Sequence, residues 1–157
     1  MFGNLTEDAI EEILGQQFIG RIGCNFNDVT YVVPISYVYD GVCVYAHAEE
    51  GMKLNMMRQN PNVCFEIDTM EKIGNWQSVI SWGTYEEVTD ENERAAALKM
   101  LLNRPVPMSA SKTAHLTPNW PFHAKNLNEI KGVVFRIKLH IKTGRFESTD
   151  EVSYGLA

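Results

Sequence analysis

Residues 43–61 read CVYAHAEEGMKLNMMRQNP, and this stretch is the most informative part of the sequence for predicting the fold. It begins as an apolar strand, turns at 50–51, and continues as a short helix that ends at 60–61, where a proline follows. Lys53 falls in the first turn of that helix, where free backbone N–H groups attract anions and a cation is disfavoured. The stretch therefore predicts a seat for the phosphate of a nucleotide-like cofactor, with Arg58 nearby as a second cation.

The sequence on either side of this stretch contains further turn, helix and strand patterns. The pair Asp40-Gly41 follows an apolar run and is typical of a β-hairpin. Asp90 precedes strong helix formers, with Glu93 three residues on, as in a capping box. We expect helices at about 6–15, 51–59 and from 90 onward, strands at 18–24, 63–67, 78–88 and 133–141, a hairpin at 29–47, a turn at 25–28, and loops at 68–76 and 103–128.

The last strand has the clearest pattern, because apolar residues alternate with mostly polar ones from 133 to 142. Such alternation predicts one buried and one solvated face. With short connections and no βαβ alternation, the pattern favours a mainly β fold, namely a six-stranded antiparallel barrel with flanking helices. We expect a single domain over 1–157, with a core at about 5–147 and a tail at 148–157.

Composition excludes several classes of function. The net charge of −6 argues against a nucleic-acid or anionic-membrane binder, because both need a basic surface. Cys24, Cys43 and Cys64 are widely spaced in apolar runs and are interpreted as buried, reduced thiols. No signal-peptide pattern and no apolar run of spanning length is found, so a cytoplasmic location is expected. His115 and His123 lack further ligands at metal-binding spacing, so no metal site is expected.

Several segments together resemble one known family. These are residues 32–35 (VVPI), 45–48 (YAHA), 51–53 (GMK), 60–65 (NPNVCF) and 78–88 (SVISWGTYEEV), followed by VFRI at 134–137 and TGR at 143–145. Their order and spacing resemble the pyridoxamine 5′-phosphate oxidase-like superfamily, and within it the flavin-nucleotide-binding branch related to nitroimidazole reductases. The resemblance covers roughly residues 5–147 and implies an FMN-binding split barrel that works as a homodimer with flavin at the subunit interface.

The resemblance also implies roles for individual residues. Lys53 falls at a phosphate-binding position, and Met52 falls where the vitamin-synthesising oxidases carry an arginine. The strand at 32–35 lies where the backbone follows the isoalloxazine ring. The members of strand 32–35 are Val32, Val33, Pro34 and Ile35. The remaining candidates are Ala46 and His47, near the phosphate and ribityl chain, and Gln77 and Ser78, at a further flavin contact.

Not all of these residues need a functional role. A lone histidine at a strand end, such as His47, is more often a structural hydrogen-bonding residue than a proton donor, and Pro34 could mark an edge strand. Trp82 is expected in the core or the dimer interface, whereas Trp120 and Phe122 could cover the flavin from the partner subunit. The methionines at 52, 56, 57 and 100 are expected to fill the core.

The resulting functional expectation is an FMN-dependent oxidoreductase that reduces a small aromatic or nitro-type substrate with NAD(P)H. The alternative is a flavin-binding carrier or sensor without efficient turnover. Pyridoxamine phosphate oxidation is disfavoured, because the residues at 154–157 differ from the basic, Trp-containing segment of those oxidases. A split barrel that binds haem or a deazaflavin ranks lower still.

Overall fold

Seven antiparallel strands form one sheet in the computed structural model, which describes residues 1–105 and 126–149. The strand order is β1-β7-β4-β3-β2-β5-β6, and β6 also pairs with β7, so six strands close into a barrel that β1 extends. The elements are β1 (Phe2–Asn4), α1 (Glu7–Gln16), β2 (Ile19–Phe26), β3 (Val29–Tyr39), β4 (Cys43–Ala48), α2 (Met52–Gln59), β5 (Asn62–Lys72), β6 (Asn75–Glu87), α3 (Glu91–Leu102), the 3-10 helix η1 (Leu127–Glu129) and β7 (Val133–Ser148).

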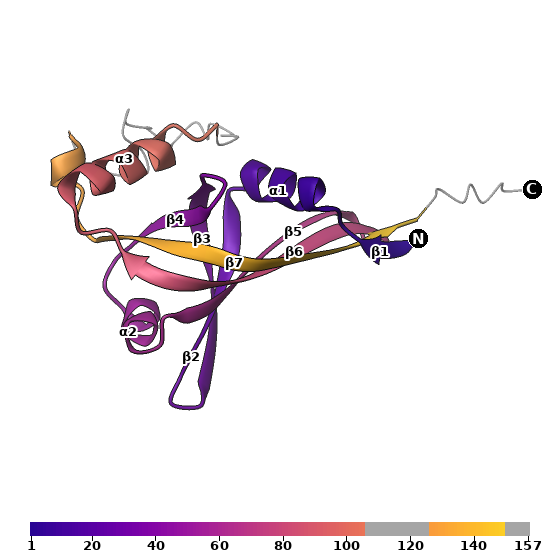
Figure 1. Ribbon diagram of the computed structural model, residues 1–157, viewed down its shortest axis with the longest axis horizontal. Coiled ribbons are helices and arrows are strands. Elements are labelled where there is room, and N and C mark those ends of the chain that lie inside the picture. Colours follow the sequence, from indigo (N-terminus) through magenta and orange to yellow (C-terminus); the bar gives the residue numbers. More distant parts are fainter. Residues whose placement is uncertain (106–125, 150–157) are drawn as a thin grey trace, which may run out of the picture.

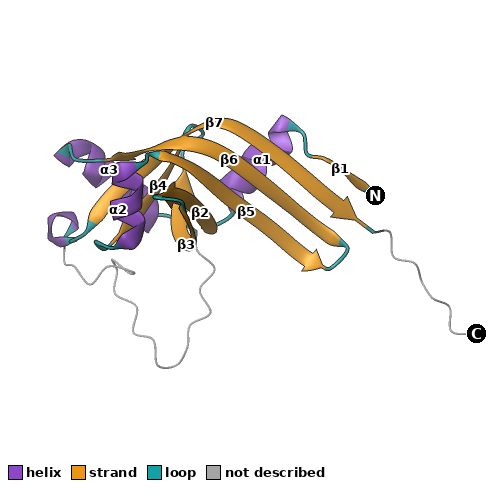
Figure 2. Ribbon diagram, turned by 90° about the horizontal axis from the view of Figure 1, so that it is seen from below, coloured by secondary structure: helices purple, strands orange, loops and turns teal. Residues whose placement is uncertain are grey.

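The helices flank the barrel on different sides. Figure 1 shows α1 and α3 on one side of the long strand β7, with α2 on the other. Strands β5, β6 and β7 run side by side well beyond the rest of the barrel, toward the N-terminus (Figure 2). The core inside the barrel includes Tyr37, Phe65 and Phe135, all fully buried, and a second cluster joins Leu98 of α3 to Val134 of β7.

The predicted fold class is confirmed, as are the three helices and the hairpin turn. At that turn Asp40 Oδ1 accepts hydrogen bonds from the N–H groups of Val42 and Cys43 at 2.8 and 2.7 Å, and Gly41 has a φ of +98°. A side chain that takes over these turn bonds, beside a glycine in the left-handed region, explains why the Asp-Gly pair was a reliable signal.

Two expected connections are shorter in the structure than predicted. The loop predicted at 68–76 is mostly strand, because β5 and β6 stay paired from Asn62↔Thr84 to Lys72↔Asn75. Likewise the turn predicted at 25–28 is only two residues long: Asn27 and Asp28 have φ values of 51° and 59°, and the residues before them belong to β2. Polar residues in these strands face solvent at the barrel surface, so their polarity indicated loops that the ladder does not form.

The alternation predicted for the last strand holds only up to Leu139. In the ladder, Trp82 pairs with Ile141 and the next residue, Gly83, pairs with Leu139, so His140 is an extra residue in β7. Such a β-bulge shifts the following side chains to the other face. Ile141, expected to be buried, is therefore 59% exposed, and Lys142 turns inward to Glu11.

Helix α2 packs its apolar side on the barrel core through Leu54, Met56 and Met57. The C-cap residue Asn60 also ties it to the β2–β3 hairpin, since its side-chain amide donates to the Asn25 carbonyl at 2.8 Å. These contacts hold the helix at a definite place on the barrel. No helix in residues 1–105 or 126–149 has the length and apolar character needed to cross a bilayer.

Candidate functional site

The outer face of the barrel carries an apolar row that crosses five strands. In the ladder, Val32, Gly23, Cys64, Trp82 and Ile141 are successive cross-strand partners. Side chains of residues directly opposite each other point to the same face of a sheet, so these five residues share one surface. This surface is exposed, with Val32 at 62% and Trp82 at 45%.

A hollow of about 560 Å³ lies over this row. Its volume falls in the range of small-molecule and cofactor sites, roughly 300–1,000 Å³. The lining is mostly apolar, with a few polar groups at the margins. The lining residues are Gly23, Cys24, Asn25, Thr30, Val32, Asn62, Val63, Cys64, Trp82, Gly83, His140 and Ile141.

Lys53 of α2 is linked to this hollow through Cys24, one of the lining residues. Burial raises the pKa of the Cys24 thiol, and the positive charge of Lys53 acts against this shift, so the two side chains lie within electrostatic range of each other. Burial also lowers the pKa of Lys53 itself. Within the described ranges Lys53 forms no ion pair with a carboxylate, so its desolvated charge is left without compensation.

Arg21 and Arg136, two other cations of the barrel, differ from Lys53 because they have acidic partners. Arg21 pairs with Glu66 and Asp68, while Arg136 pairs with Glu86 at 2.9 Å. Such surface pairs contribute little to stability. Their importance here is that they leave those cations unavailable to an anionic ligand.

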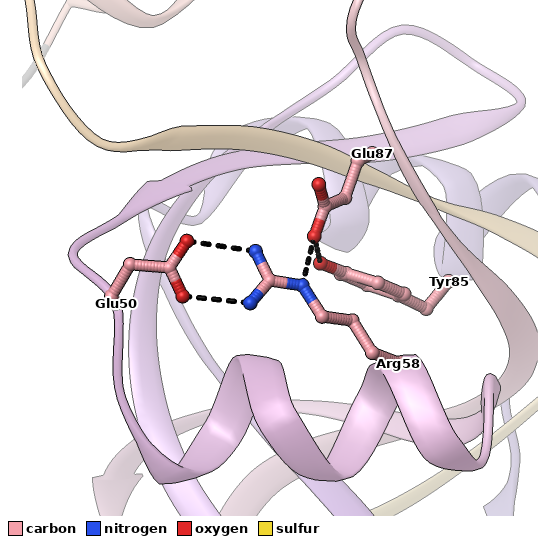
Figure 3. A network of polar contacts seen from close by, with 4 residues as sticks. All are labelled: Glu50, Arg58, Tyr85 and Glu87. Carbon is pink, nitrogen blue, oxygen red and sulfur yellow. Dashed lines mark hydrogen bonds and ion pairs between the residues drawn. The ribbon is translucent and has the colours of Figure 1, made fainter.

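Arg58 was expected to support Lys53 as a second anion-binding cation, and this expectation was wrong. Its guanidinium donates to both carboxylate oxygens of Glu50, at 2.7 and 2.8 Å, and its Nε donates to Glu87. Figure 3 shows Arg58 enclosed between these two carboxylates, with the Tyr85 hydroxyl on Glu87 at 2.8 Å. These bonds use three of the five guanidinium N–H groups and hold Arg58 between two carboxylates, so its charge is already balanced.

Three of the predicted cofactor residues share the outer face of the barrel. Val32 lines the hollow, and Pro34, two residues along β3, is exposed on the same face. Ser78 lies on that face of β6, where its hydroxyl donates to Glu66 at 3.3 Å. Glu66 also holds Arg21, which pairs with Pro34 across β2 and β3. A polar patch thus adjoins the apolar row.

Other predicted residues point elsewhere. The side chains of Ile35 and Ala46 face the barrel core and are 6% and 0% exposed. His47, one residue after Ala46, faces the opposite side of β4, where its Nε2 contacts the Lys131 carbonyl oxygen. Gln77 lines a separate, polar hollow of about 500 Å³ at the far end of β6. The structure does not bring these four side chains to the hollow.

The two remaining candidates flank the site without entering it. Val33 is half-buried on β3, and its side chain points away from the exposed row that holds Val32. Met52, at the first position of α2, is 53% exposed, so its predicted core-filling role was wrong. Met56 and Met57 do fill the core, whereas Met100 is half-buried.

The cysteine prediction was correct for two of the three residues. All three thiols are free, and Cys24 and Cys43 are buried, but Cys64 is only half-buried because it faces the hollow. Residues 1–105 and 126–149 contain no group of three or more side chains able to hold a metal ion. Predictions for Trp120, Phe122 and the two histidines at 115 and 123 lie outside the described residues.

Sequence reasoning missed most of the hollow's lining, including His140 and Ile141 of β7. The His140 side chain contacts the Thr84 hydroxyl at 2.8 Å, which orients it at the rim. The bulge brings Ile141 to the outer face, and nothing in the local sequence marks that bulge. Trp82 was expected in the core or the dimer interface; it is 45% exposed and so lies outside the core of the subunit.

Comparison with known proteins places the chain in a family. The sequence profile of the family described as pyridoxamine 5′-phosphate oxidase matches residues 6–146. The chain belongs to this family, and its closed, six-stranded barrel with flanking helices is the split barrel of related structures.

Two solved structures illustrate the similarity. An FAD-binding protein from Mesorhizobium loti is 27% identical, with a TM-score of 0.71, 94% of this chain covered and 99% of that chain. A protein assigned to 5-nitroimidazole antibiotic resistance in Bacteroides thetaiotaomicron shares the fold at 21% identity, with a TM-score of 0.69 and coverage of 93% and 87%. Among curated proteins, an uncharacterised protein of Rhizobium meliloti is 28% identical over 105 residues, 64% of this chain and 70% of that protein.

Proposed function

We propose that this protein is a flavoprotein that binds FMN beside Lys53 and reduces a small aromatic or nitro-type substrate with NAD(P)H. The observation that carries the proposal is Lys53: a desolvated cation in the first turn of α2, with no carboxylate partner among the described residues. A phosphate would compensate this charge and would also accept hydrogen bonds from the free N–H groups that begin the helix.

The adjoining hollow suits the remainder of a flavin. A flat aromatic ring system needs an apolar surface, and the row of Val32, Trp82 and Ile141 offers one. The hollow lies open on the outer face, so a second subunit packed on this face would enclose a ligand there. We therefore propose a homodimer with flavin at the interface, in which Lys53 holds the phosphate and the apolar row contacts the ring.

A bound flavin would supply the redox chemistry, with a nicotinamide as the electron donor. The protein then has three tasks: it holds the phosphate, presents one ring face to the substrate and excludes water from the other. The relative from Mesorhizobium loti binds FAD, and the Bacteroides fold neighbour is assigned to nitroimidazole resistance. These names support a flavin cofactor and a nitro-type substrate, respectively.

A flavin carrier or sensor is the second candidate, and the openness of the hollow in a single subunit favours it. The absorption spectrum of the purified protein, followed by chromatography of the heat-released cofactor, tests both candidates. FMN is the expected cofactor; FAD would replace that part of the proposal, and a colourless protein that takes up no added flavin would refute it. Turnover of NADPH with a nitroaromatic acceptor, faster than with free FMN, separates the enzyme from the carrier.

Lys53→Ala is expected to weaken FMN binding by about ten- to a hundredfold, because a charge-assisted phosphate contact is worth roughly 1.5–3 kcal/mol. Flavin titration by fluorescence quenching measures this. Lys99→Ala, which removes an exposed lysine of α3, is the matched control and should bind FMN as the wild type does. Equal affinity of the Lys53 variant and this control would remove Lys53 from the site.

A further inference from the structure

Glu50 is the carboxylate best placed to compete with a ligand for Lys53. It lies three residues before Lys53 and directly ahead of α2, the end of a helix that attracts negative charge. Glu50 and Lys53 carry opposite charges at the same end of α2, so the two side chains attract each other. Glu50 is also largely exposed, with 63% of its side chain accessible, so little packing restrains it.

In the structure, however, Glu50 is bound to Arg58 instead. The two parallel N–H···O bonds, at 2.7 and 2.8 Å, direct both carboxylate oxygens to the guanidinium. Bidentate pairs of this kind are geometrically specific as well as strong. The hydrogen bond from Arg58 also lowers the pKa of Glu50, so the carboxylate remains charged and held.

Arg58 is in turn fixed by strand β6. Its Nε donates to Glu87, and the Tyr85 hydroxyl donates to the same Glu87 oxygen (Figure 3). Arg58 lies in the last turn of α2 and Glu50 ahead of its first turn. One side chain therefore spans the helix and directs the competing carboxylate away from its N-terminal end.

We propose that Arg58 is a positioning residue that sequesters Glu50, so that Lys53 remains free to bind the phosphate of the cofactor. This inference rests on the proposed function, because it concerns the same anion site. It explains why Lys53 has no carboxylate partner in the described part of the chain although a glutamate lies three residues away. It also explains why the helix carries an arginine that does not itself contact the hollow.

The test is a mutant cycle of Arg58→Gln, Glu50→Gln and the double variant, titrated with FMN and with riboflavin. Riboflavin lacks the phosphate, so the ratio of the two affinities isolates the phosphate contribution from general folding effects. Arg58→Gln should lower the FMN-to-riboflavin ratio about two- to fivefold, the effect of one released surface ion pair. Glu50→Gln should leave the ratio unchanged or raise it, and the double variant should return it to the wild-type value.

A purely structural network predicts a different pattern. In that case Glu50→Gln and Arg58→Gln would lower the affinities alike, for both ligands, and the double variant would not recover; this result would overturn the inference. If Arg58→Gln does not fold, Arg58→Lys replaces it, since lysine keeps the charge but loses the bidentate geometry. A wild-type protein that binds FMN no better than riboflavin would refute the phosphate site itself, whereas a preference that is insensitive to Arg58 would refute only its positioning role.

Discussion

Tyr37 shows how one residue can join two elements of this barrel. Its ring is fully buried and packs edge-on against Phe65, with the ring centroids 4.9 Å apart. Its hydroxyl donates to the Leu14 carbonyl at 2.8 Å, close to the end of α1. Burial raises the pKa of Tyr37, so the hydroxyl stays a neutral donor throughout the physiological range. The hydrogen bond therefore fixes α1 on the barrel without placing a charge in the core.

Tyr37→Phe should lower the free energy of unfolding by about 1–2 kcal/mol, because it leaves the Leu14 carbonyl without its buried partner. Urea unfolding followed by circular dichroism measures this loss. Tyr31→Phe is the control: Tyr31 is only half-buried on the same strand, and its hydroxyl has no hydrogen-bond partner in the described ranges. Equal stabilities of the two variants would mean that the Tyr37 hydroxyl contributes nothing.

The capping box predicted at the start of helix α3 is confirmed only in part. Asp90 caps the helix as expected, since one carboxylate oxygen accepts from the N–H groups of Asn92 and Glu93 at 3.0 and 2.9 Å. The Glu93 side chain, predicted to return to Asp90 in a capping box, instead approaches Arg136 of β7 at 3.7 Å. An ion pair with another element thus takes the place of the local contact, and at this exposed position it contributes little to stability.

Asp90→Ala should destabilise the protein by about 1 kcal/mol, the usual cost of removing an N-cap side chain. Thermal or urea unfolding tests this. Thr6→Ala makes a useful comparison, because Thr6 caps α1 through one longer bond to the Ala9 N–H, at 3.3 Å, and should cost less. A larger loss for Thr6→Ala would contradict this ranking of the two caps by their hydrogen bonds.

The exposed apolar row on the barrel is a feature of the whole molecule. Val32, Trp82 and Ile141 come from three strands distant in sequence and are 62%, 45% and 59% exposed. Apolar side chains gathered on one face are typical of an interaction surface. The proposed homodimer would bury this row and place the two cofactor sites at the interface.

Trp82→Lys should therefore shift the protein toward monomers at micromolar concentration and weaken flavin retention. The reason is that a lysine at the centre of an apolar interface would lose its hydration without gaining a partner. Sedimentation velocity measures the mass, and cofactor absorbance measures retention. Val42→Lys, at an exposed apolar position in the β3–β4 turn, should change neither. A Trp82 variant that remains dimeric would locate the interface elsewhere.

Local chemistry made several features predictable from the sequence. The Asp40-Gly41 turn, the Asp90 cap and the position of Lys53 at the start of α2 each depend on a few neighbouring residues, and the structure has all three. Alternation along β7 was predictable for the same reason, up to the point where a bulge interrupts it. The phosphate role of Lys53 remains a prediction.

Three other features depend on which strands become neighbours. The ladder through residues 68–76 forms because β5 and β6 pair along their full length, although their side chains there resemble a loop. The bulge at His140 arises from the register between β6 and β7. Judged by sequence spacing alone, Arg58 could have been a second anion-binding cation beside Lys53. In the structure Arg58 pairs with Glu50, because β6 places Glu87 where it also holds the guanidinium.

The sequence by itself thus determined the mainly β class, the helix starts, the tight turns and the placement of a lysine where an anion is favoured. These follow from backbone preferences and hydrogen bonds that act within a few residues. Only the tertiary structure decided which cations are paired, which side of β7 faces outward after the bulge, and which residues from five strands line one hollow. Closure of the barrel sets the register between strands, and register determines which distant side chains meet.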